Sequence, residues 1–96
     1  MLGKFQEMQQ KMNEVKSKLD TMVATVEAAG GDIKIIVNGN RKVLSININP
    51  ALQHGDREEL EEQLVVAMNR SIEKAEELNE NEMKNAANGM LPGGLF

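Results

Sequence analysis

The sequence contains no cysteine, tryptophan or tyrosine, and it has only two phenylalanines and two prolines. Without cysteine there is neither a disulfide framework nor a thiolate metal site. The single histidine, His54, lies in a polar connection, which is typical of a solvated turn residue rather than of an acid–base catalyst. The longest apolar run, residues 64–68, is far shorter than the roughly 20 residues that a membrane helix requires. We therefore expect no enzymatic activity, no cofactor or metal, no small-molecule substrate and no membrane association.

Charge is distributed unevenly along the 96 residues, whose net charge is −4. Residues 1–50 carry seven Lys and Arg against five Asp and Glu, or +2, whereas residues 51–96 carry four against ten, or −6. The acidic balance argues against wholesale coating of a polyanion but leaves room for a local basic face. The length indicates one domain with a thin core. The opening residues lack the apolar stretch of a signal peptide, so we expect a cytoplasmic protein.

Residues 2–22 have the apolar spacing of a helix with a heptad seam. The seam consists of Phe5, Met8, Met12, Val15, Leu19 and Met22. One interpretation is an amphipathic helix packed on its own domain. The other is pairing between two chains, because three heptads exceed what a thin monomer core can cover. Glu14 and Lys18 stand four residues apart, the spacing of an exposed helical ion pair.

Residues 23–49 predict three strands, at about 23–28, 32–38 and 42–49, joined as an antiparallel meander. Gly30 and Gly31 supply the first turn, residues 38–40 supply a second turn whose residues tolerate positive φ, and Pro50 ends the pairing. Ile36 and Val43 are expected on an otherwise polar face of the sheet. Self-association would cover them economically. The polar residues of this face are Lys34, Ser45, Asn47 and Asn49.

A second long helix is predicted at about 57–88, with a capping-box-like start at Asp56. Asn88 and Gly89 are typical of a helix C-cap, and residues 89–96 then form a flexible tail. The predicted fold is α+β, with two layers in the order α-β-β-β-α. The expected buried face of the second helix consists of Leu60, Leu64, Ala67, Met68, Ser71, Ile72, Ala75 and Leu78.

Five local sequences, in order and at matching spacing, resemble the YbaB/EbfC family of bacterial nucleoid-associated proteins. They are residues 5–12, 32–39, 45–52, 62–69 and 90–94. The resemblance implies a homodimer whose helices project from a central sheet like the arms of tweezers. It also implies binding of double-stranded DNA in which the helices take part, a location in the nucleoid, and a chromosome-organising or gene-regulating role.

Phosphate contact requires basic side chains that reach one surface together. Lys4, Lys11 and Lys18 are seven residues apart and therefore form one row along the first helix. Arg41 and Lys42 in the second turn are further candidates, although charges in such a turn also keep a sheet edge soluble. The shortage of aromatic residues argues against single-stranded nucleic acid, and no helix-turn-helix or zinc spacing is present.

A protein-interaction module with weak or no affinity for DNA is the alternative. The acidic second helix and the apolar residues of the tail are the features that favour it. Double-stranded DNA, which the resemblance implies, is the first hypothesis, and contact through the phosphate backbone should then dominate.

Overall fold

The computed structural model describes residues 2–90. It confirms the predicted α+β fold with a three-stranded antiparallel sheet in the order β1-β2-β3. Among these residues, no helix is both long and apolar enough to cross a membrane. The elements in chain order are α1 (Leu2–Thr21), β1 (Val23–Ala28), the 3-10 turn η1 (Ala29–Gly31), β2 (Ile33–Asn38), β3 (Val43–Ile48), α2 (Pro50–Gln53) and α3 (Arg57–Met90).

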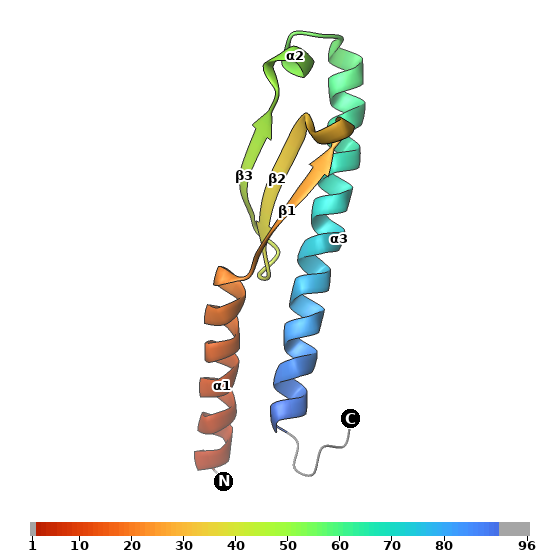
Figure 1. Ribbon diagram of the computed structural model, residues 1–96. Helices are drawn as coiled ribbons and strands as arrows, with labels where there is room; N and C mark the ends of the chain where they lie inside the picture. The colour runs from red at the N-terminus through yellow and green to blue at the C-terminus, as the bar shows by residue number, and fades with distance from the viewer. Residues whose placement is uncertain (1, 91–96) are drawn as a thin grey trace.

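Helix α3 runs the length of the molecule and joins its two parts (Figure 1). Its 34 residues correspond to about 51 Å at 1.5 Å per residue. The N-terminal half of α3 covers one face of the sheet, mainly over β1 and β2. Its C-terminal half continues past the sheet, where α1 lies beside it. We call α1 and this half of α3 the arm.

Every second residue of β2 points into the core. Ile33, Ile35 and Val37 are all buried against α3, and each such side chain contributes about 2 kcal/mol to folding. Ala67 and Ala75 face them from α3, and these small side chains let the helix backbone approach the sheet. The core is thin, as the length of the chain predicts.

The prediction that Val43 lies on the polar face of the sheet is wrong. The register between β2 and β3 shifts by one residue between Ile36 and Val37. Ile36 pairs with Ser45, but Val37 pairs with Val43, so Leu44 is the extra residue of a β-bulge. Val43 therefore shares the α3 side of the sheet with Val37.

Helix α3 leaves β3 largely uncovered, and this changes the expected buried face of the helix. Ile72 was predicted to be buried, but 55% of it is exposed. It lies beside Val43 at the open side of α3. Val65, two helical turns earlier, is 61% exposed on the same side. The other predicted residues of that face are buried or half-buried.

The connection between β3 and α3, which the sequence indicates only as a polar connection, contains a short helix, α2. Asn49 caps it by accepting a hydrogen bond from the backbone N–H of Ala51, at 3.0 Å, and Pro50 occupies its first turn. Asp56, the predicted cap residue of α3, accepts a hydrogen bond from the N–H of Glu58 at 3.1 Å, one residue before the N–H that a capping box engages.

The predicted C-cap at Asn88 and Gly89 is wrong, because α3 passes through both residues to Met90. Six residues of the predicted tail, 91–96, lie outside the described residues. The other predicted boundaries of the helices and strands agree with the structure or differ from it by one residue.

Candidate nucleic-acid interface

The row of Lys4, Lys11 and Lys18 lies along α1, the outlying helix of the molecule. Lys4 and Lys18 are separated by about 21 Å along the helix axis, because each residue rises 1.5 Å. All three side chains are exposed. We call them the lysine row. Its length matches a stretch of duplex that carries about 12 phosphate charges.

A groove separates α1 from the C-terminal half of α3, and two members of the lysine row lie on its border. Acidic residues lie there as well, so the groove has two lysines and two glutamates. We call it the arm groove. Its residues are Lys11, Glu14, Val15 and Lys18 from α1, and Glu82, Asn85, Ala86 and Gly89 from α3.

Lys18 is paired across the arm groove. Its Nζ lies 3.0 Å from Oε1 of Glu82. The Glu82 side chain is only 8% exposed, whereas 61% of the Lys18 side chain is exposed. The sequence predicted Glu14 as the partner of Lys18, but the structure places the contact with α3. Local spacing brings Glu14 near, yet only Glu82 offers a desolvated carboxylate, where attraction is stronger.

Arg41, in the second turn, contacts α3. The Arg41 guanidinium donates to Oδ1 of Asn79 at 3.3 Å, and its Nε lies 4.0 Å from Oε1 of Glu76. Arg41 also carries the positive φ of this turn, +62°, which the sequence analysis expected at residues 38–40. Lys42 is exposed next to it. Of the two candidates in the turn, only Lys42 is without an ion pair among residues 3–89.

The same turn fixes the direction of α1. The N–H of Gly39 donates to the carbonyls of Leu19 and Met22, at 3.0 and 2.9 Å, and so satisfies the end of the helix. The Asn40 side chain donates to the Lys16 carbonyl, and Asn79 on α3 donates to the Gly39 carbonyl at 3.0 Å. The turn therefore joins α1, the sheet and α3 at one point, and it sets where the lysine row lies.

Among residues 57–89, three basic side chains of α3 have a partner, whereas Lys84 is exposed and has no ion pair. Lys74 pairs with Glu77 within α3 at 3.5 Å. Arg70 instead reaches across to the Glu27 carbonyl on β1, at 2.9 Å. Over residues 57–89, the acidic α3 therefore offers a polyanion a single basic side chain without a partner, Lys84.

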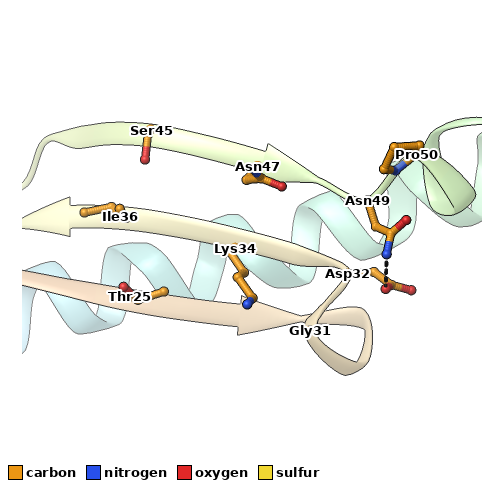
Figure 2. Close-up of a pocket in the computed structure, with 9 residues that line it drawn as sticks. All are labelled: Thr25, Gly31, Asp32, Lys34, Ile36, Ser45, Asn47, Asn49 and Pro50. Atoms are coloured by element: carbon orange, nitrogen blue, oxygen red, sulfur yellow. Dashed lines mark hydrogen bonds between the residues drawn. The ribbon is translucent and has the colours of Figure 1, made fainter.

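The open face of the sheet carries a shallow polar hollow (Figure 2). Lys34 lies near its centre, but its Nζ is 3.7 Å from Oε1 of Glu27 on the neighbouring strand. Asp32 adds a second carboxylate at one end, where Asn49 donates to it at 3.2 Å. This face is hydrogen-bonding but not basic, so the lysine row is the better candidate for phosphate contact.

The heptad seam of α1 is buried only towards its C-terminal end. Leu19 is buried, and Met12, Val15 and Met22 are half-buried. Phe5 and Met8 are 63% and 60% exposed. Packing on the same chain accounts for the second half of the seam but leaves the first half uncovered.

The sequence profile of the YbaB/EbfC DNA-binding family matches residues 1–90. The chain belongs to this family. It is also 45% identical, over 92 residues, to a nucleoid-associated protein of Flavobacterium johnsoniae, an alignment that covers 96% of this chain and 86% of that protein. A nucleoid-associated protein of Chlorobium phaeobacteroides is 39% identical over 93 residues, covering 97% and 83% of the two chains.

The fold of this YbaB/EbfC chain also occurs in a solved structure. The crystal structure of an uncharacterized protein from Helicobacter pylori superimposes with a TM-score of 0.79 and covers 88% of this chain and 90% of that chain. The sequences are 22% identical, so the likeness concerns the fold alone.

Sequence reasoning missed two residues that organise this YbaB/EbfC arm, Glu82 and Asn79. Both lie where the apolar period of α3 weakens after Leu78. The weaker apolar period indicates that α3 changes its packing partner there. Beyond the sheet, this side of α3 contacts α1 and the turn instead of an apolar face. The identity of the partners, however, follows only from the three-dimensional arrangement.

Proposed function

We propose that this protein binds double-stranded DNA through the phosphate backbone, and that the lysine row of α1 makes the principal contact. A nucleoid location and a chromosome-organising or regulatory role follow from such binding and are in keeping with the names of the relatives. The observation that carries the proposal is the alignment of three exposed lysines on an outlying helix.

Two members of the row are well suited to this contact. Lys4 and Lys11 have no ion pair among residues 3–89, so their charge is not cancelled locally. A lysine ammonium is a point charge on a flexible stem and meets phosphates without a fixed geometry. Because aromatic residues are nearly absent, base stacking contributes little, and discrimination between sequences should be weak.

The salt dependence of duplex binding tests the proposal. Titration of a labelled mixed-sequence duplex, followed by fluorescence anisotropy at several salt concentrations, should give affinities that fall steeply with salt. If two protomers each contribute Lys4 and Lys11, the slope of log K against log salt should be about −4, at about 0.9 per phosphate contact. No binding at low salt would contradict the proposal and would favour a protein partner.

We further propose that the DNA-binding form is a homodimer. The uncovered side of β3 and the adjoining side of α3 form an apolar surface, which we call the β3 face. A second copy is the occupant that we propose, because the surface is apolar and can be complementary to itself across a two-fold axis. The β3 face consists of Val43, Leu44, Ile46, Val65 and Ile72, each at least 43% exposed.

The exposed first half of the α1 seam extends the same proposal. Phe5 and Met8 lie far along the arm from the β3 face, so a second copy would have to meet both ends of the molecule to cover them. Contact at the β3 face is the primary element, and pairing at the seam residues is the secondary one.

A charge introduced into the β3 face should dissociate the dimer. We expect Ile72→Glu to shift the protein to monomer at micromolar concentration, because two acidic side chains would be desolvated near the two-fold axis. Sedimentation equilibrium measures the change. Val66→Glu is the matched control, since Val66 is 39% exposed on the opposite, β1 side of α3, one turn before Arg70. Equal dissociation constants for the two variants would contradict this interface.

A further inference from the structure

We infer that Glu82 competes with DNA phosphate for Lys18, so that the lysine row presents Lys4 and Lys11 to a duplex and withholds Lys18 while the pair persists. The inference rests on the proposed function, since it concerns regulation of the same surface. It assigns a second role to a buried carboxylate that also joins α1 to α3.

The geometry of the pair carries the inference. The carboxylate of Glu82 lies within the protein, and the ammonium of Lys18 lies at the surface 3.0 Å away. A phosphate that approached this ammonium would also come close to the buried carboxylate, where water and salt screen repulsion poorly. While the pair persists, the charge of Lys18 is therefore cancelled for a polyanion.

Withdrawal of Lys18 alone is unfavourable. A buried carboxylate without its partner is strongly disfavoured unless water reaches it. The arm groove offers Asn85 and the more distant Lys11 as other donors, together with a second carboxylate, Glu14. Lys18 can transfer to a phosphate at low cost only if the arm groove opens and hydrates Glu82.

The packing of α1 opposes such an opening at Lys18. Burial along the seam increases from Phe5, which is 63% exposed, to Leu19, which is 1% exposed and directly follows Lys18. The helix is tied to the turn at its C-terminal end, and only Met22 separates it from β1. A rotation of α1 about this tied end moves its N-terminal half most and Lys18 least, so the pair of Lys18 with Glu82 persists.

The Glu82→Gln variant tests the inference. Glutamine keeps the shape of the side chain but cannot hold the ammonium by charge, so Lys18 should become available. We expect duplex affinity to rise about tenfold and the salt slope to steepen by about 2 for a dimer, since two phosphate contacts are gained. Glu80→Gln is the matched control, because Glu80 is exposed on the same part of α3 and loses the same charge. It should raise affinity by about twofold at most.

The double variant Lys18→Gln with Glu82→Gln checks that the gain comes through Lys18. Lys18→Gln added to Glu82→Gln should remove the roughly tenfold gain in duplex affinity, because the released ammonium is then absent. A double variant that keeps the gain would show that loss of the Glu82 charge acts without Lys18, and the inference would be overturned.

The two proposals fail in different ways. Equal effects of Glu82→Gln and Glu80→Gln, with binding of the parent intact, would overturn the competition by Glu82 but leave DNA binding standing. Absence of duplex binding by the parent and by every variant would overturn the proposed function, and the competition with it.

Discussion

Replacement of Gly39 by alanine is expected to lower the free energy of unfolding by about 2 kcal/mol, because the turn and α1 meet there without room for a side chain. A Cβ on Gly39 would lie 2.6 Å from Cδ2 of Leu19 and 3.1 Å from its carbonyl oxygen. The Leu19 side chain is buried and cannot move aside without leaving the core. The backbone contact gives no relief either, since Gly39 donates to that same carbonyl.

Chemical unfolding followed by helical circular dichroism measures this loss, at one fixed protein concentration because dimerisation would contribute to stability. Gly3→Ala is the matched control. A Cβ at Gly3 meets nothing within 4 Å, and alanine is the better helix former, so stability should be unchanged or slightly higher. Equal stability of the two variants would show that the contact between turn and helix is looser than the structure indicates.

The sequence predicts this fold well because its elements are determined by short-range periodicity. The alternation of Ile33, Ile35 and Val37 indicates a strand buried on one face, and the seam residues of α1 indicate a helix. Asp56 marks the start of α3 through capping chemistry that needs no knowledge of the tertiary structure. Each of these signals lies within one or two turns of chain, where sequence spacing and spatial spacing coincide.

The features that were predicted wrongly depend on how elements meet. A one-residue bulge moved Val43 to the other side of the sheet, and no local pattern distinguishes Leu44 as the extra residue. Ile72 fits the period of a buried helix face, but α3 is displaced towards β1 and leaves it exposed. Gly39 was predicted as a turn residue that tolerates positive φ. In the structure, a side chain at this position is excluded because Gly39 lies close to Leu19.

The candidate DNA site, too, could be predicted from the sequence only in part. The lysine row follows from spacing alone, because residues seven apart share one side of a helix. Which lysines are already engaged does not follow, because Lys18 and Glu82 are 64 residues apart in the sequence and meet only when α1 lies beside α3. Arg41 was likewise predicted as a candidate DNA contact, but in the structure its side chain contacts Asn79 and Glu76 on α3.

Reversal of charge at Lys4 and Lys11 together is expected to have the largest effect on DNA binding, a loss of about 100-fold or more. In a dimer the change removes four phosphate contacts and places four carboxylates against the duplex. Charge-assisted hydrogen bonds contribute about 1 kcal/mol or more each, and 1.4 kcal/mol corresponds to tenfold. The salt slope should fall by about 4, which would leave little salt dependence. Stability should change little, because both side chains are exposed.

Lys16→Glu distinguishes the lysine row from the charge of the helix as a whole. Lys16 is exposed on α1 but stands two residues from Lys18, about 200° around the helix axis, and so faces away from the row. Comparison with Lys11→Glu alone keeps the charge change identical. We expect Lys11→Glu to weaken duplex binding about tenfold and Lys16→Glu to weaken it by about twofold, through screened long-range repulsion. Equal losses measured by anisotropy at one salt concentration would mean that DNA responds to the net charge of α1, and the assignment of the lysine row would be wrong.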